Sequence, residues 1–290
     1  MNDNPIGYLD SGIGGVTVLR KTVKLLPNEN YFFFSDSAHN PYGDKTDEEV
    51  IARCDEIVQF MIQKNCKAVV LACNTASAKA AGFLREKYDF PIVAIEPAYK
   101  MVHDNNPDGA TLVMATKGTI ESEKFHKLFY KYYNENTALM PCVGLADIIE
   151  KGDRAEIKKY LFENLAEYVG LVDNVVLGCT HYPLIKDEIS AVLGDVKFFD
   201  GSVGVSKQLK RVLEKNDLLS SSQTLGTVEF VDSSADKATR IAKQKRFFEL
   251  LKSILTFIIC ILFFVLYIFY FLFGYSCYIN NFFNRHIFIQ

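Results

Sequence analysis

The chain has 290 residues and a formal net charge of −3, so it gives no electrostatic basis for nucleic-acid binding. Its seven cysteines form no CxxC pair and no zinc-ligand spacing, which argues against a disulfide framework or a structural zinc site. The polar start, residues 1–5, lacks the apolar segment of a secretory signal. We therefore expect the catalytic part to be cytoplasmic, with reduced thiols.

Residues 6–10 predict a first buried strand, and residues 16–26 carry apolar side chains at helical spacing. The turn between them, residues 11–15, is rich in glycine. It lacks the third glycine of a dinucleotide-binding fingerprint, and Asp10 would repel a phosphate. We expect this backbone to approach a small zwitterion instead, with Asp10 as its charge partner.

The following segments continue to alternate between strand and helix. A polar loop, residues 36–43, follows the second strand, and Thr46 with Glu49 forms a capping-box pattern that begins a helix ending near Lys64. The other elements predicted up to the hinge at residues 96–97 are strands at 31–35, 69–72 and 91–95 and a helix at 76–87.

The pattern starts again at residues 110–115, a strand followed by a turn at 116–119 that parallels residues 6–12. Alternating strands and helices favour parallel sheets, so the whole chain is a weak duplication of an α/β unit. The later elements predicted are helices at 121–133, 154–170, 183–193 and 202–215 and strands at 175–178, 196–199 and 227–231.

Two matching segments are the most informative feature of the sequence. Residues 69–75 and 175–181 are each an apolar β-branched run that ends in a small residue, a cysteine and then polar side chains. Ligands in open α/β sheets bind beyond the carboxyl ends of such strands, which places Cys73 and Cys179 where chemistry is expected. The other five cysteines are interpreted as small core or tail hydrophobes.

Four motifs together make the resemblance specific. Residues 10–15 (DSGIGG), 41–43 (PYG), 72–75 (ACNT) and 178–183 (GCTHYP) resemble the motif set of the glutamate racemases, in the cofactor-independent aspartate/glutamate racemase superfamily. The resemblance covers about residues 5–232 and implies an α/β fold of two pseudo-symmetric domains with parallel-type sheets flanked by helices. The active site would lie between the domains, which we place at residues 1–96 with about 205–245, and at 97–204.

The resemblance also implies the activity and its residues. Cys73 and Cys179 would be two bases that interconvert L- and D-glutamate by 1,1-proton transfer, without a cofactor or metal, supplying D-glutamate for peptidoglycan and hence cell shape. Asp10 would assist Cys73, and His181 with Glu150 would assist Cys179, although residues 141–144 depart from the commoner pattern before Glu150. The side chains and backbone expected around glutamate are those of Asp10, Ser11, Tyr42, Gly43, Asn74, Thr75, Thr180 and His181, with Thr116 and Thr119 as further candidates.

A two-thiol site suits this chemistry, since inversion of an α-carbon needs a base on one face and an acid on the other. Thr180-His181 favours glutamate over aspartate, because the aspartate-type relatives more often have Thr-Glu there. An aspartate or other amino-acid racemase, an inactive ligand-binding relative and a thiol hydrolase using Cys179 and His181 stay open. A hydrolase needs one nucleophile and leaves the second cysteine unexplained. Relatives are commonly homodimers, so we expect one here.

Residues 246–290 depart from the family. The run at 254–273 is uncharged and long enough, as a helix of about 30 Å, to cross a hydrocarbon core. One interpretation is a hydrophobic C-terminal helix that contacts the membrane, with basic residues before it keeping the catalytic part in the cytoplasm. The other is an aberrant chain end that replaced the family's terminal helix.

Overall fold

In the computed structural model, which describes residues 2–252, the apolar runs predicted from the sequence form parallel strands in two sheets. The first sheet has the order β4-β3-β1-β2-β9 and the second the order β6-β5-β7-β8. The strands are β1 Ile6–Asp10, β2 Tyr31–Ser35, β3 Ala68–Leu71, β4 Ile92–Ala94, β5 Thr111–Ala115, β6 Thr137–Pro141, β7 Asn174–Gly178, β8 Lys197–Asp200 and β9 Val228–Asp232.

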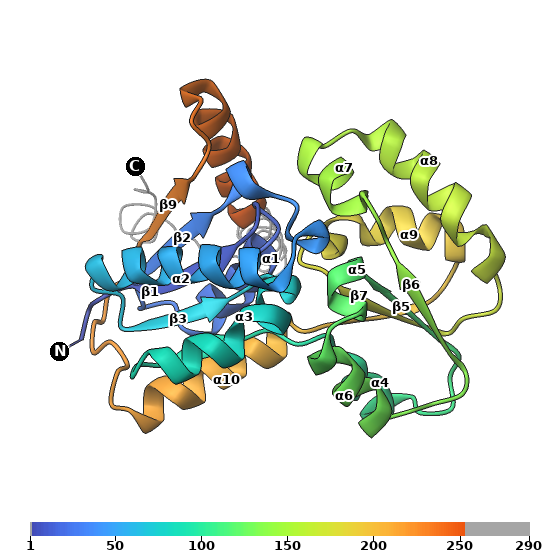
Figure 1. The fold of residues 1–290 in the computed structure, drawn as a ribbon, viewed down its shortest axis with the longest axis horizontal. Coiled ribbons are helices and arrows are strands. Elements are labelled where there is room, and N and C mark those ends of the chain that lie inside the picture. Colours follow the sequence, from blue (N-terminus) through green and yellow to red (C-terminus); the bar gives the residue numbers. More distant parts are fainter. Residues whose placement is uncertain (1, 253–290) are drawn as a thin grey trace, which may run out of the picture. The chain divides into compact units, whose positions relative to one another are not determined.

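Helices cover both sheets, as parallel strands joined by crossover connections require. The helices are α1 Val16–Leu25, α2 Asp47–Gln63, α3 Asn74–Lys87, α4 Tyr99–Asn105, α5 Lys117–Ile120, α6 Glu123–Lys131, α7 Leu145–Lys151, α8 Arg154–Leu165, α9 Lys186–Leu193 and α10 Ser202–Lys215, with short 3₁₀ turns at Ser37–His39, Tyr42–Asp44, Ala166–Tyr168 and Tyr182–Ile185. We call the first sheet with α1, α2, α3 and α10 the first lobe, and the second sheet with α4 to α9 the second lobe (Figure 1).

The strands of the first lobe present alternate side chains to two helical layers. Leu9 packs into a core with residues of α2 and α3. Its neighbour Tyr8 faces the other way and donates a hydrogen bond from its hydroxyl to Thr22 of α1 at 2.6 Å. Thr22 in turn lies 2.8 Å from Ser206 of α10, so the helix that follows the second lobe returns to pack on the first. The predicted capping box of α2 is present, with Thr46 and Glu49 exchanging hydrogen bonds.

The predicted α/β fold with parallel sheets flanked by helices is confirmed. The boundaries differ mainly in the second lobe, where the helix expected at 183–193 is a 3₁₀ turn followed by α9, and α8 ends at Leu165 before a further turn. The sequence indicated neither a strand nor a helix for the segments that form α4, β6 and α7, and α5 stands where a turn was predicted at 116–119.

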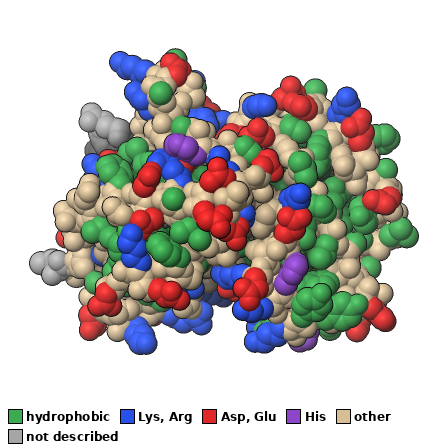
Figure 2. Space-filling model, in the orientation of Figure 1, with side chains coloured by type: hydrophobic (Ala, Val, Ile, Leu, Met, Phe, Trp, Pro, Cys, Tyr) green, Lys and Arg blue, Asp and Glu red, His purple; other side chains and the backbone are tan. Residues whose placement is uncertain are grey.

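Residues 1–247 form one compact unit, and residues 248–290 belong to a second. The apolar run at 254–273, predicted as a hydrophobic helix, lies outside the described residues. Among residues 2–252, no helix combines the length and apolarity needed to cross a membrane. On the face drawn in Figure 2, acidic and basic side chains are interspersed, in keeping with the small net charge.

Candidate active site

The first predicted cysteine follows β3 directly, at the point where the chain turns into α3. Cys73 is the N-cap residue of this helix, and its sulfur accepts a hydrogen bond from the backbone N–H of Ala76 at 3.5 Å. Its thiol also contacts the hydroxyl of Ser11 at 3.8 Å. A helix N-terminus favours a thiolate, but burial, with the negative charge of Asp10 next, raises the pKa of Cys73 to about 12. The thiol form of Cys73 is therefore favoured near neutral pH.

Asp10, the last residue of β1, lies beside Cys73 and is completely buried. Its carboxylate accepts hydrogen bonds from the N–H groups of Gly12 and Gly15, at 3.2 and 3.0 Å, and from the hydroxyl of Thr180 at 3.2 Å. Burial raises the pKa of Asp10 to about 6, against the opposing effects of His181 and these backbone donors. A carboxyl group with this pKa can hold or release a proton near neutral pH.

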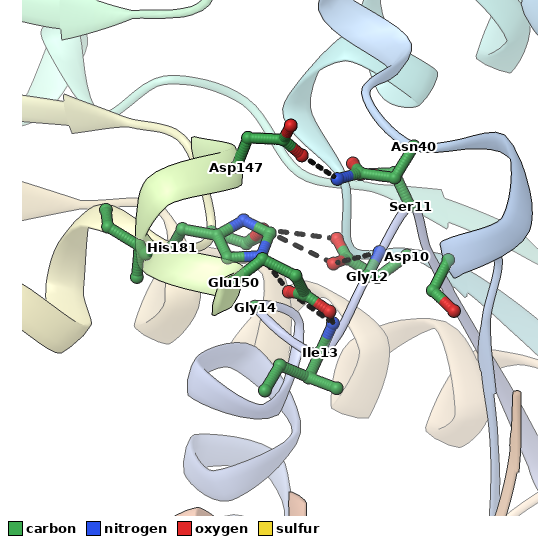
Figure 3. Close-up of polar contacts among 12 residues, drawn as sticks. Asp10, Ser11, Gly12, Ile13, Gly14, Asn40, Asp147, Glu150 and His181 are labelled. Carbon is green, nitrogen blue, oxygen red and sulfur yellow. Dashed lines mark hydrogen bonds and ion pairs between the residues drawn. The ribbon is translucent and has the colours of Figure 1, made fainter. Parts of the chain in front are cut away.

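The second predicted cysteine follows β7 and stands at one end of a chain of polar side chains. The sulfur of Cys179 lies 3.8 Å from Nδ1 of His181. The other ring nitrogen of His181, Nε2, lies 2.6 Å from Oε2 of Glu150 (Figure 3). All three side chains are buried. The arrangement is a thiol, an imidazole and a carboxylate in series, with Glu150 supplied by α7.

Neighbouring charges determine the protonation of these three side chains. Burial alone would lower the pKa of His181, but its hydrogen bonds to Cys179 and Glu150 outweigh burial and raise that pKa well above the ordinary value. Burial would likewise raise the pKa of Glu150, yet His181 and then Lys243 lower it to about 2. These shifts favour a protonated imidazole between the Glu150 carboxylate and the sulfur of Cys179.

The glycines of the turn at residues 11–15 allow the two lobes to meet. A Cβ atom on Gly14 would lie 2.6 Å from Nδ1 of His181, and one on Gly12 would lie 2.7 Å from Oε2 of Glu150. The N–H of Ile13, between them, donates to Glu150 at 3.2 Å. The turn predicted to approach a small zwitterion thus has second-lobe side chains as its close neighbours in this structure.

The remaining predicted site residues fall into three groups. Thr75, Thr116 and Thr119 are brought together, since the hydroxyls of Thr75 and Thr116 lie 2.9 Å apart and Thr116 donates to Thr119 at 2.9 Å. Asn74 is buried, and within residues 2–252 its Oδ1 has no hydrogen-bond partner, which leaves an acceptor beside Cys73 for a ligand. Tyr42 is buried with its hydroxyl donating to Asp36 at 2.6 Å, so its polar end is already engaged.

Contacts between the lobes surround this site. A Cβ on Gly43 would lie 3.1 Å from Thr116, so the loop at residues 41–43 packs closely against the second lobe. In the same loop region, Asn40 donates to Asp147 of α7 at 2.9 Å (Figure 3). Cys73 and Cys179 lie within electrostatic range, because a charge on Cys179 contributes to the raised pKa of Cys73. The two strand ends thus each carry a buried thiol with a titratable neighbour, Asp10 for Cys73 and His181 for Cys179.

The sequence reasoning missed two residues that touch this site. Lys243 and Arg246 lie in a helix that begins at residue 237, and both contact Glu150. The sequence predicts them to be part of the basic flank that precedes a membrane segment. Their i,i+3 spacing puts them on one helical face, but nothing in that spacing identifies Glu150 as their partner. Among residues 2–252, no cluster of histidine, cysteine or acidic side chains could hold a metal ion.

Comparison with known proteins places this chain in a class. The Asp/Glu/Hydantoin racemase family model matches residues 6–203, and the chain belongs to this family of racemases, which are isomerases. Within that family its relatives are glutamate racemases, as the four motifs predicted. The glutamate racemase of Clostridium perfringens is 44% identical over 243 residues, which cover 82% of this chain and 94% of the relative.

Solved structures show the same likeness. A glutamate racemase of Francisella tularensis in complex with D-glutamate has a TM-score of 0.72 and 29% identity, covering 85% of this chain and 94% of that one. The Escherichia coli enzyme, in complex with L-glutamate and the activator UDP-MurNAc-Ala, has a TM-score of 0.72 and 27% identity, covering 84% and 95%. Both enantiomers are thus bound by proteins that share this fold.

Proposed function

We propose that this chain is a glutamate racemase that interconverts L- and D-glutamate by a two-base proton transfer between Cys73 and Cys179, for peptidoglycan synthesis. One observation carries the proposal: two buried cysteines follow the carboxyl ends of β3 and β7 in two similar sheets, and each has a different titratable partner. A hydrolase would use one nucleophile and an oxyanion hole and leaves the other cysteine without a role.

The proposed mechanism moves one proton off the α-carbon and another onto it. A thiolate on one face takes the α-proton, so that an S–H bond forms, the Cα–H bond breaks and its electron pair stays on the substrate. The thiol on the opposite face then gives its proton to the α-carbon, and its sulfur keeps the S–H electron pair. His181 exchanges a proton with Cys179, and Asp10, whose pKa is about 6, serves Cys73 in the same way. Cys73 would deprotonate D-glutamate and Cys179 L-glutamate.

Water exclusion and fixed donors support the carbanion-like intermediate, since the mechanism uses no cofactor to delocalise its charge. The buried acceptor of Asn74 and the N–H donors and hydroxyls near the two sulfurs would fix the substrate's amino and carboxylate groups. We assign this contact role to Ser11, Gly43, Asn74, Thr75, Thr180 and His181, with Thr116 and Thr119 reaching it from the second lobe. Tyr42 would affect the substrate site indirectly, through the hydrogen bond that its hydroxyl donates to Asp36.

We also propose that the lobes are the two domains predicted from the sequence, residues 1–96 with about 205–245, and residues 97–204. The contacts between Asn40 and Asp147 and between Ile13 and Glu150 support a site between them. A cytoplasmic location and assembly as a homodimer follow from the same family resemblance and stay proposals.

The direct test is circular dichroism of each enantiomer of glutamate and aspartate with no cofactor added. We expect glutamate to lose its optical signal faster than aspartate, and faster turnover of aspartate would contradict the substrate assignment. In deuterium oxide, the product enantiomer should carry solvent deuterium from the first turnovers while recovered substrate stays protiated. Early deuterium in recovered substrate, at the rate of racemisation, would contradict the two-base mechanism.

A further inference from the structure

Glu150 has more partners than its histidine. Besides His181 Nε2 at 2.6 Å, its carboxylate accepts from the N–H of Ile13 at 3.2 Å and from Nζ of Lys243 at 2.8 Å. Lys243 is half-buried, whereas Lys245, two residues further on, is exposed. The lysine that contacts Glu150 comes from residues 237–247, a segment that follows β9 of the first lobe.

Arg246, on the same helical face, contacts the backbone of α7 where that helix ends. Its guanidinium donates to the carbonyl of Ile149 at 2.8 Å and to the carbonyl of Glu150. The last carbonyls of a helix have no partner within the helix, so Arg246 completes the C-terminus of α7. Gly152, in the left-handed conformation with φ of 80°, leaves space for the Arg246 guanidinium, because a Cβ on Gly152 would lie only 3.3 Å from it.

Phe247, the residue after Arg246, fixes this segment to the first lobe. Phe247 is fully buried, with its ring centroid 4.6 Å from that of Phe33 in β2 and 4.5 Å from that of Phe230 in β9. The segment is therefore held by the first sheet while its two cationic side chains reach α7 of the second lobe. Such an arrangement limits where the Glu150 carboxylate can lie relative to His181.

We propose that Lys243 and Arg246 are positioning residues that hold the Glu150 carboxylate against His181 and so orient the acid–base partner of Cys179. The inference rests on the proposed function for its kinetic consequence, but the contact itself is a property of the protein alone. In metal sites, groups that orient a histidine through its second nitrogen change activity about 10- to 100-fold when they are removed, and we expect the lower end of that range for this metal-free pair.

The test compares three variants of the full-length chain. Lys243→Met removes the contact, Lys243→Arg keeps a cation in reach of Glu150, and Lys245→Met removes the same charge from an exposed position two residues away. For Lys243→Met we expect kcat to fall about tenfold, with a smaller change in KM, because the substrate contacts are retained. Lys243→Arg should recover most of the rate, and Lys245→Met should match the unaltered protein. Lys243→Met kinetics equal to those of Lys245→Met would overturn the proposal.

A spectroscopic measurement separates this proposal from the proposed function. The Nε2 proton of His181, in its short hydrogen bond to Glu150, should give a downfield proton NMR signal that is absent from His181→Asn. We expect Lys243→Met to lose or broaden that signal while Lys245→Met keeps it. If the unaltered protein fails to racemise glutamate, the proposed function fails and this signal still decides the positioning role. If Lys243→Met does not fold, as judged by urea denaturation, Lys243→Gln takes its place, and an unchanged signal in that variant would overturn the proposal.

Discussion

The ends of β3 and β7 occupy equivalent positions in two similar sheets, yet they give their cysteines different surroundings. Cys73 caps a 14-residue helix and lies beside a carboxyl group whose pKa is raised to about 6. Cys179 is followed by a short 3₁₀ turn and lies beside an imidazolium held by a carboxylate whose pKa is lowered to about 2.

The difference shows how a pseudo-symmetric pair of sites can hold two protonation states at once. Racemisation needs one sulfur protonated and the other deprotonated in each direction. Asp10 disfavours a thiolate at Cys73 through its negative charge, while the imidazolium of His181 presents a hydrogen-bond donor to Cys179. Thr180, bound to Asp10 through its hydroxyl, connects the two halves directly. The shared fold supplies the positions, and different side chains supply the asymmetry.

The largest expected effect comes from removing either sulfur. Cys73→Ser and Cys179→Ser should each lower racemisation by about 10³-fold or more, since a hydroxyl is too weak an acid to replace a thiol. Enantiomers have equal free energies in water, so kcat/KM must fall equally in both directions. Slow exchange of the α-proton with deuterium oxide should distinguish the variants: Cys73→Ser should retain exchange with L-glutamate and Cys179→Ser with D-glutamate.

Cys66→Ser is the matched control for these two variants, because Cys66 is similarly buried, at 8% exposure against 6% and 7% for the other two, and precedes β3 instead of following it. It should racemise glutamate at the unaltered rate. A Cys66→Ser enzyme as impaired as the other two would show that the loss of activity reflects folding. Retained racemisation in Cys179→Ser would contradict the assignment of Cys179 as one of the two bases.

The two carboxyl groups, Asp10 and Glu150, should affect the stability of the fold in opposite directions. The raised pKa of Asp10, about 6, means that stability is lost as the pH rises from about 4 to about 6. Asp10→Asn should therefore raise the free energy of unfolding at pH 7, by about 1–3 kcal/mol, while abolishing activity. The gain should vanish below about pH 4, where both proteins are neutral at this position.

Glu150→Gln should show the opposite sign. The lowered pKa of Glu150, about 2, gives stability that is present above about pH 4.5 and lost as the pH falls toward 2. The variant should be less stable at pH 7 by about 3 kcal/mol. Urea denaturation across pH 3–8 measures both differences. Two variants that shift stability in the same direction would contradict the assigned charge states.

The smallest expected effect tests the approach of the lobes. In Gly14→Ala the new methyl group would meet Nδ1 of His181 at 2.6 Å, so the imidazole must move away from its partners. We expect racemisation to fall about tenfold, which corresponds to about 1.4 kcal/mol of activation free energy. Gly82→Ala, in α3 with nothing within 4 Å of the new Cβ, is the control and should keep full activity. Equal activity in the two variants would show that the site tolerates separation of the lobes here.

The sequence predicted the strand ends well because buried parallel strands are continuous apolar runs, which are recognised locally. Cys73 and Cys179 could be located for that reason, and the apolar runs also located β1, β5 and β7. β6 was not predicted because Thr137–Pro141 is a half-exposed edge strand that ends in proline, and such strands have a weak hydrophobic pattern.

Contacts between distant segments could not be predicted in this way. Lys243 lies 93 residues from Glu150 in the sequence, and nothing local in either segment specifies the other. The glycines at 12 and 14 were recognised as a place of close approach, but the approaching groups, Glu150 and His181, belong to the other lobe. The family resemblance associated Glu150 with His181, whereas the cationic residues that hold Glu150 required the three-dimensional structure.

The strand order of the first sheet has a consequence for how the protein is made. β2 is synthesised early, but its outer neighbour β9 follows almost two hundred residues later, after the whole second lobe. The second sheet is encoded by one continuous stretch, residues 111–200, so it can be completed on the ribosome before the first sheet is. Until β9 emerges, β2 is an open edge and Phe33 lacks both Phe230 and Phe247. The nascent first lobe therefore exposes an unpaired strand edge, and with it a risk of aggregation, until β9 is made.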